Sequence, residues 1–178
     1  QSYTQEEWLT ALVELVVKEQ YDGLFPCDER AIFPLFENKE KFPSSCLLAI
    51  PNAEVIEHLF DKNTTKQLAI KCNVPVARGE IITLKDKSLS HLQAQFGQKF
   101  VIKPTLSFKS EELSKRQKVE IVETEEQLAA YTKYIDDDDQ FLIEEYFTGI
   151  GEGVSLLAAN GEVQYLFAHS RVNEPRAG

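Results

Sequence analysis

Apolar residues recur at helical spacing near the start of the chain and then gather in short runs. The spacing between Trp8 and Val16 predicts a helix over residues 5–19. The pattern that follows predicts a strand, a helix, a strand and a helix, at residues 23–26, 28–36, 46–50 and 52–60. This order is an incomplete parallel α/β unit, because no strand precedes the first helix. We therefore expect the chain to begin inside a domain.

After residue 61 the pattern predicts a helix and then a second, separate sheet. The helix covers 62–73 and ends before Pro75. Strands and helices then follow as strand, helix, strand, strand, helix, strand, at 79–84, 89–96, 99–103, 118–122, a segment capped by Thr124, and 140–147. This order predicts a compact sheet with two helices on one face.

A β-hairpin is expected near the end of the chain. Asn160 and Gly161 separate the apolar segments 154–159 and 162–170, and Asn-Gly is the preferred pair for a two-residue type I′ turn. Taken together, these elements predict a mixed fold of helices and strands, α/β (α+β).

Composition and charge narrow the class of protein. The chain has 178 residues, of which 43% are apolar and 27% charged, as expected for a folded soluble protein of one or two domains. It contains no apolar run long enough to cross a membrane and no secretory signal. A net charge of −10 argues against nucleic acid as a partner, although it permits a nucleotide ligand. The chain has no methionine, so we expect Gln1 not to be the natural start.

The three cysteines predict neither a disulfide framework nor a metal site. Cys27, Cys46 and Cys72 are odd in number and widely spaced. Reduced thiols in a cytoplasmic protein are the simplest interpretation. The histidines His58, His91 and His169 also lie too far apart in sequence to suggest a metal cluster.

Two lysines are candidates for binding an anion. Lys62 follows the helix cap Asp61 and lies in the first turn, where a cation opposes the helix dipole unless an anion is nearby. Lys103 ends a buried strand just before Pro104, where a side chain can point into a cleft. Solvated surface positions are the alternative for both lysines.

The segment 140–147 offers a further site. In an extended strand the C=O of Glu145 and the N–H of Phe147 face the same edge, and this pair matches N6 and N1 of adenine. Glu144 and Tyr146 flank the pair. A solvent-exposed pair of carboxylates is the simpler alternative.

The polar stretch after Lys103 has two interpretations. It contains four basic residues and two acidic ones, for a local charge of +2. The basic residues are Lys109, Lys115, Arg116 and Lys118, and the acidic ones are Glu111 and Glu112. The stretch is either a cationic lid that closes over phosphates or an ordinary surface hairpin. No Gly-x-x-x-x-Gly-Lys-Ser/Thr loop is present, which excludes a P-loop nucleotide site.

Four segments in this order resemble the ATP-grasp superfamily, in particular its carbamoyl-phosphate-synthase-like and carboxylate–amine ligase branches. They are DKNTTKQLAIKCNVPVARGE (61–80), QKFVIKP (98–104), QFLIEEYFTG (140–149) and GVSLLAANGEVQYLFAHSR (153–171). The resemblance implies three parts: a partial parallel α/β pre-ATP-grasp domain at 1–60, an ATP-grasp N-terminal subdomain at 61–147, and the start of the C-terminal subdomain at 148–178.

The resemblance also assigns roles to residues. It implies that Lys62 and Lys103 contact phosphates and that the segment Glu144, Glu145, Tyr146 and Phe147 binds adenine. Glu152 is the best match to the glutamate that binds the ribose hydroxyls, and Arg171 matches a basic residue near the site of phosphoryl transfer. ATP and Mg²⁺ are the implied cofactors, with the metal ligands expected beyond Gly178, so little turnover is expected from this chain alone.

The implied function is that of an ATP-dependent carboxylate–amine ligase. A substrate carboxylate would be activated as an acyl phosphate and attacked by an amine, without membrane or nucleic-acid partners; a homo-oligomer is left open. One departure from the family is that residues 105–118 contain no glycine, although relatives carry a glycine-rich loop there. A non-catalytic or regulatory nucleotide-binding module is therefore the alternative. A protein-interaction domain that shares only the α/β pattern is a third hypothesis.

Overall fold

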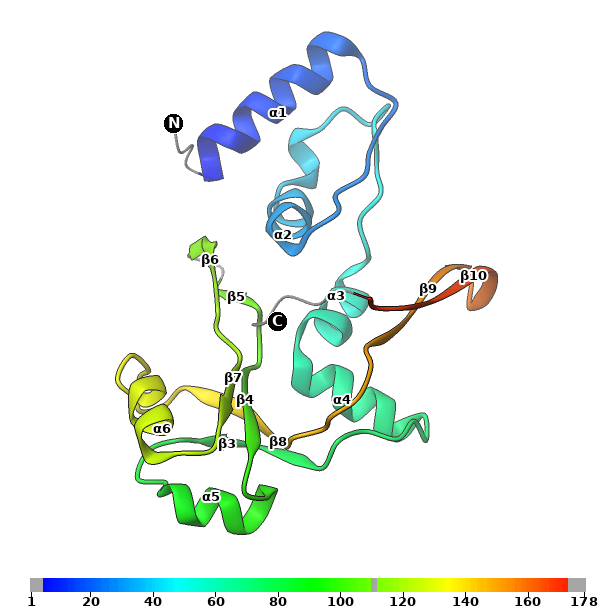
Figure 1. The fold of residues 1–178 in the computed structure, drawn as a ribbon. Coiled ribbons are helices and arrows are strands. Elements are labelled where there is room, and N and C mark those ends of the chain that lie inside the picture. The colour runs from blue at the N-terminus through cyan, green and yellow to red at the C-terminus, as the bar shows by residue number, and fades with distance from the viewer. Residues whose placement is uncertain (1–4, 110–111, 173–178) are drawn as a thin grey trace. The chain divides into compact units, whose positions relative to one another are not determined.

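The computed structural model describes residues 5–109 and 112–172, and its contacts divide the chain into two compact units (Figure 1). Unit 1 contains Gln1–Val76 and Pro104–Lys118. Unit 2 contains Ala77–Lys103 and Val119–Gly178. The polar segment after Lys103 therefore belongs with the first unit, although the sheet of the second unit surrounds it in sequence.

Unit 1 begins with the predicted partial α/β arrangement. Its elements are α1 (Gln5–Glu19), β1 (Gly23–Leu24), α2 (Glu29–Glu37), a 3₁₀ turn (Lys39–Lys41), β2 (Leu47–Leu48), α3 (Ala53–Phe60), α4 (Lys62–Lys71), β5 (Phe108–Lys109) and β6 (Glu112–Arg116). Strands β1 and β2 pair in parallel, with Gly23 opposite Leu47. They are shorter than predicted: the N–H of Ala49 still donates to the carbonyl of Leu24 (2.9 Å), but the N–H of Ile50 donates back to the carbonyl of Leu48 (2.9 Å).

Side chains at the predicted cap positions begin three helices of unit 1. Asp28 Oδ1 accepts the N–H of Arg30 at the start of α2 (2.9 Å), and Asn52 Oδ1 accepts that of Val55 at the start of α3 (2.9 Å). Asp61 Oδ1 accepts the N–H of Thr64 at the start of α4 (2.8 Å). Each bond satisfies one of the backbone donors that the first turn of a helix leaves without a partner. A small apolar core of this unit is formed by α1, α2 and the segment that follows α2, with Leu9, Val16, Leu35, Phe42 and Cys46 buried.

Unit 2 contains the predicted four-stranded sheet. Its elements are β3 (Gly79–Thr83), α5 (Leu89–Phe96), β4 (Phe100–Pro104), β7 (Glu120–Val122), α6 (Glu125–Thr132), β8 (Gln140–Glu145), β9 (Glu152–Ala159) and β10 (Glu162–Ser170). The strand order is β3-β8-β4-β7, with β3 antiparallel to β8 and β4 antiparallel to β7. The predicted order of strands and helices is confirmed.

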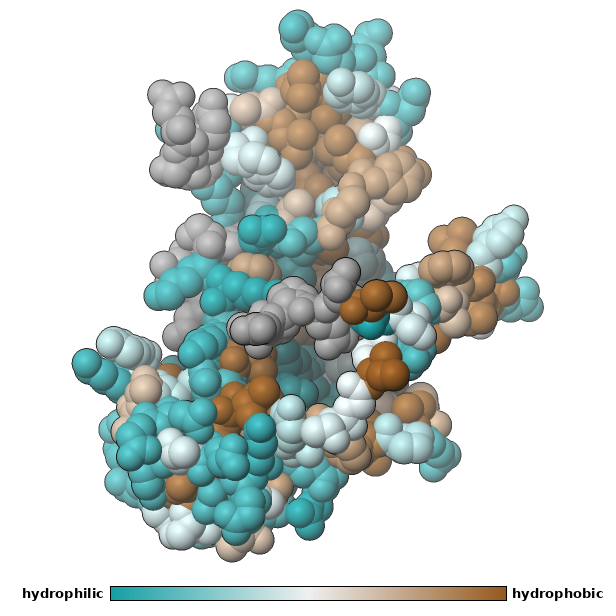
Figure 2. Space-filling view, in the orientation of Figure 1, coloured by the Kyte–Doolittle hydropathy of each residue, from teal (hydrophilic) through white to brown (hydrophobic). Residues whose placement is uncertain are grey.

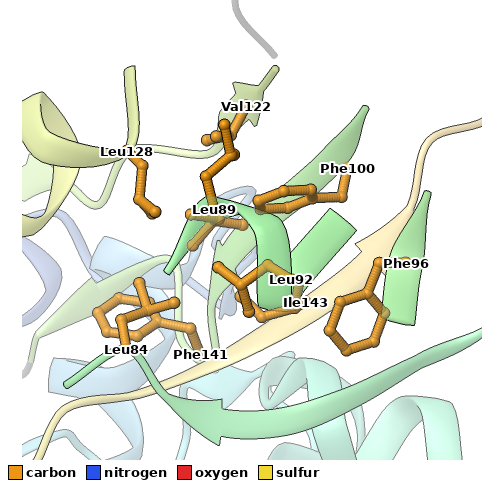
Figure 3. Packing of buried hydrophobic residues seen from close by; sticks show 10 residues of the cluster. Leu84, Leu89, Leu92, Phe96, Phe100, Val122, Leu128, Phe141 and Ile143 are labelled. Carbon is orange, nitrogen blue, oxygen red and sulfur yellow. The ribbon is translucent and has the colours of Figure 1, made fainter. Parts of the chain in front are cut away.

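Both helices of this unit pack on the same face of the sheet, as predicted (Figure 3). Leu92 and Phe96 from α5 and Leu128 from α6 join Phe100 and Ile143 from the strands in one buried cluster. Side chains alternate along a strand, so the residues next to these core positions occupy the opposite face. That opposite face receives Val101 and Lys103 from β4, and Leu142 and Glu144 from β8.

Strands β9 and β10 form the predicted hairpin. Asn160 and Gly161 have φ angles of 52° and 81°, as a type I′ turn requires. Among the described strands, β9 and β10 pair only with each other. The hairpin exposes apolar side chains (Figure 2). The large ones are Val154, Leu156, Leu157, Val163, Tyr165, Leu166 and Phe167.

Candidate functional site

A lysine–glutamate pair lies on the face of the unit 2 sheet that is opposite its helices. Lys103 Nζ on β4 and Glu144 Oε2 on β8 are 2.5 Å apart. The carboxylate is buried, with 9% of the side chain exposed, whereas 33% of the Lys103 side chain is exposed. The ion pair neutralises the buried carboxylate, and the lysine keeps donor capacity toward solvent, because an ammonium has three donors. The site therefore presents one cation at the end of a strand.

The close approach of β3 to β8 at Glu144 depends on a glycine. Gly79 lies opposite Glu144 in the antiparallel ladder. A Cβ atom at position 79 would overlap the carbonyl oxygen of Ile143 and lie 2.6 Å from Glu144 Cγ. Only a residue without a side chain fits beside the buried carboxylate. Sequence reasoning missed this role, because an isolated glycine at the start of a strand has many explanations.

We expect Gly79→Ala to destabilise the chain by about 1–3 kcal/mol, the usual cost of overpacking a closely packed site. The added methyl group would push β3 away from β8 at Glu144. Urea unfolding measures the effect, with Gly149→Ala as the matched control, since a Cβ there meets nothing within 4 Å. Equal midpoints for the two variants would contradict the packing argument.

Strand β8 ends at Glu145 instead of continuing to Phe147 as predicted. The N–H of Glu145 donates to the carbonyl of Arg78 (2.9 Å). In return, the N–H of Arg78 donates to the side-chain Oε1 of Glu145 (2.8 Å). The carboxylate thus takes the donor that the Glu145 carbonyl would receive in a continuing ladder, and regular pairing stops there. The same carboxylate lies 3.8 Å from Arg78 Nε, a contact that no sequence motif indicated.

The residues after β8 differ in their surroundings. The ammonium of Lys99 lies over the ring of Tyr146, 4.5 Å from its centroid. Phe147 is 69% exposed. Of these predicted residues, Lys103 and Glu144 contact each other, whereas Glu145 contacts Arg78 and Tyr146 contacts Lys99.

Two predicted site residues lie together at the open end of the hairpin. The Ser170 hydroxyl donates to the Glu152 carboxylate, at 2.9 and 3.0 Å from its two oxygens. The N–H of Arg171 donates to the carbonyl of Gly151 (2.7 Å). Glu152 and Arg171 are thus held by the same strand ends.

Lys62 belongs to unit 1 and contacts the polar segment. Its N–H donates to the carbonyl of Thr105 (2.8 Å), and its ammonium donates to the hydroxyl of Ser107 (3.3 Å). These bonds tie the N-terminus of α4 to the chain just after β4. The segment itself forms the two-stranded ladder β5–β6, in which Phe108 pairs with Arg116. The predicted alternative of a hairpin is observed, and closure as a lid stays a prediction.

The described residues contain no metal cluster and no membrane-spanning helix. No group of three or more His, Cys, Asp and Glu residues in 5–109 and 112–172 is arranged to hold a metal ion. None of the helices in those ranges is both long and apolar enough to cross a bilayer. The three cysteines, all within the described part, are free thiols. The residues at the end of the chain, from 173 to 178, lie outside the described ranges.

Comparison with known proteins identifies the fold. No protein-family model matches the chain, and no curated protein matches it in sequence. Among solved structures, it is similar to an N5-carboxyaminoimidazole ribonucleotide synthetase, PurK, in complex with ADP, with a TM-score of 0.61 and 16% identity over 97% of this chain and 42% of that one.

Two further structures show the same similarity. The D-alanine-D-alanine ligase from Coxiella burnetii gives a TM-score of 0.58 with 17% identity, over 85% of this chain and 44% of that one. The carboxyaminoimidazole ribonucleotide synthase from Aspergillus clavatus, complexed with ATP, gives a TM-score of 0.54 with 15% identity, over 80% of this chain and 35% of that one. The chain spans less than half the length of these three structures. These similarities show that the chain has the ATP-grasp fold, with its mixed α/β architecture.

Proposed function

We propose that the chain is the nucleotide-binding part of an ATP-dependent carboxylate–amine ligase. The observation that carries the proposal is the Lys103–Glu144 pair on the face of the sheet away from α5 and α6. Lys103 could bind a phosphate group of a nucleotide. The backbone groups at the end of β8 could hydrogen-bond its base. The fold supports the same choice, since two of the similar structures were solved with ADP and ATP.

In the proposed site, Lys103 binds phosphate and the end of β8 binds adenine. The Glu145 carbonyl would accept a hydrogen bond from N6, and the Phe147 N–H would donate to N1. Arg78 supports this role, because its N–H bonds the Glu145 carboxylate and is not available to the Glu145 carbonyl. Glu144 positions Lys103, and Tyr146 packs against Lys99 beside the base.

The remaining predicted residues have proposed roles in the intact protein. Lys62 would contact phosphate, Glu152 the ribose hydroxyls, and Arg171 the transferring phosphoryl group. Glu152 and Arg171 lie near one another at the open end of the hairpin, which is compatible with contact to one ligand. The domain limits 1–60, 61–147 and 148–178 belong to the same proposal, as does a cytoplasmic location with reduced cysteines.

The proposed reaction has two steps. The γ-phosphoryl group of ATP passes to a carboxylate oxygen of the substrate, which gives an acyl phosphate and ADP. An amine then attacks the carbonyl carbon and phosphate leaves. Reactions of this class use Mg²⁺ to neutralise charge on the phosphates. No group of three or more His, Cys, Asp and Glu residues lies together in 5–109 and 112–172, and the proposal assigns no metal ligand there.

Base selectivity tests the proposal. Adenine presents a donor at N6 and an acceptor at N1, whereas guanine presents an acceptor and a donor at the matching positions, so the proposed edge should reject GTP. We expect ATP to bind at least about tenfold more tightly than GTP, because the wrong base leaves the Glu145 carbonyl and the Phe147 N–H unpaired in the complex. Titration of the chain with each nucleotide, followed by amide NMR shifts, measures the ratio. Equal affinities, or no binding of ATP, would overturn the assignment of this edge to adenine.

A nucleotide-binding module without catalysis is the second candidate. Residues 105–118 contain no glycine, and part of this segment is a β-ladder instead of a glycine-rich loop. Backbone N–H groups approach phosphates most closely where side chains are absent. Measurement of phosphoryl transfer by the longest natural form of the protein separates the two candidates.

A further inference from the structure

A cavity within unit 1 lies beside Lys62, which hydrogen-bonds the lining residue Ser107, and contains none of the unit 2 residues assigned to ATP. It has a volume of about 480 Å³ and is bounded by the start of α2, the end of α3 and the ladder β5–β6. Its lining residues are Cys27, Asp28, Glu29, Arg30, Ile32, Phe60, Ser107, Phe108 and Arg116. Pockets of a few hundred Å³ with aromatic walls and a few charged groups are typical of small-molecule sites.

One wall of the cavity carries an exposed ion pair. Arg30 donates from Nε to Asp28 Oδ1 (2.7 Å) and from a terminal nitrogen to Oδ2 (3.0 Å). The same guanidinium lies over the ring of Phe108, 5.6 Å from its centroid. Asp28 also caps α2, so these three groups fix the start of the helix against the ladder. The Arg30 guanidinium lowers the pKa of the Asp28 carboxyl, which keeps this wall charged at neutral pH.

Two other charged residues of the cavity lining, Glu29 and Arg116, take no part in the Asp28–Arg30 ion pair. In the part of the chain that the structure describes, the Glu29 carboxylate lies near the charges of Lys62 and Arg116 without a salt bridge to either. Burial raises the pKa of the Glu29 carboxyl, and the nearby Lys62 ammonium and Arg116 guanidinium oppose that shift. A partly desolvated carboxylate and a guanidinium therefore remain for a ligand that carries both signs of charge.

We propose that this cavity binds a small zwitterion with an apolar side group. The ammonium of the ligand would bind Glu29, its anionic group would bind Arg116, and its apolar part would pack against Phe60 and Ile32. The inference rests on the proposed function, because such a molecule would be a carboxylate or amine substrate of the ligase. The cavity lies entirely in unit 1, so the proposal needs no assumption about the placement of unit 2.

L-Leucine is the probe for this site, with two analogues that each lack one charge. These are 4-methylpentanoate, without the ammonium, and 3-methylbutylamine, without the carboxylate. Saturation-transfer NMR on the 178-residue chain, without nucleotide, gives the three affinities. We expect leucine to bind at least about tenfold more tightly than either analogue, since each charged hydrogen bond contributes roughly 1.5–3 kcal/mol.

Two substitutions locate the binding. Glu29→Gln and Arg116→Gln should each weaken leucine binding about tenfold, for the same reason. Lys85→Gln is the control, because Lys85 is in unit 2 and pairs with Asp137. Circular dichroism checks that each variant folds. The proposal is overturned if leucine does not bind, if either analogue binds equally well, or if the two cavity variants match the control.

The same experiment separates this proposal from the function on which it rests. Lys103→Ala should leave leucine binding unchanged while it weakens ATP binding. Loss of leucine binding with ATP selectivity intact rejects only the cavity proposal. Loss of ATP selectivity with leucine binding intact rejects only the nucleotide site.

Discussion

Replacement of Lys103 by alanine should weaken ATP binding about 10- to 100-fold, because the phosphate would lose a charge-assisted hydrogen bond of roughly 1.5–3 kcal/mol. Isothermal titration of ATP into the chain and the variant measures the change. Lys85→Ala is the matched control. Lys85 also forms an ion pair of 2.5 Å with a carboxylate, but that carboxylate belongs to an exposed aspartate.

A second variant distinguishes a role in binding from a role in folding. Lys103→Ala removes the cation from a buried carboxylate, which itself destabilises a protein. The double variant Lys103→Ala with Glu144→Gln removes that buried charge as well. We expect the double variant to regain stability in urea but not affinity for ATP. Recovery of both would mean that Lys103 acts only as the partner of Glu144.

Phe100→Ala should destabilise the chain by about 3–5 kcal/mol, the usual cost of removing a fully buried aromatic side chain. Phe100 has no exposed surface and lies in the cluster that joins both helices to the sheet (Figure 3). Chemical denaturation monitored by circular dichroism measures the loss. The comparison variant is Phe25→Ala, at a residue that is 75% exposed, for which a change within about 0.5 kcal/mol is expected. A cost below 1 kcal/mol for Phe100→Ala would contradict the assignment of this residue to the core.

Much of the fold could be predicted because the local patterns are strong. Asp28, Asn52 and Asp61 are cap residues by their chemistry, and the structure uses each of them as a cap. Asn160 and Gly161 tolerate the positive φ angles of their turn. Lys103 lies near the end of its strand, as predicted, but its place on the face away from α5 and α6 follows only from the structure.

Other features depend on contacts between distant residues and leave no local pattern. The Arg78–Glu145 contacts join positions 67 residues apart and end β8 two residues earlier than predicted. The contact of the Lys62 ammonium with Ser107 joins positions 45 residues apart. For the same reason, the sequence could propose Lys103 as an anion ligand but could not identify Glu144 as its partner.

The hairpin β9–β10 determines how the chain should be handled in solution. Both of its outer edges lack a neighbouring described strand, and its apolar side chains are exposed. Edges and patches of this kind promote association between molecules through added strands and apolar contacts. The apparent molar mass from light scattering should therefore increase with protein concentration. Binding constants are best measured in dilute solution, where single chains predominate.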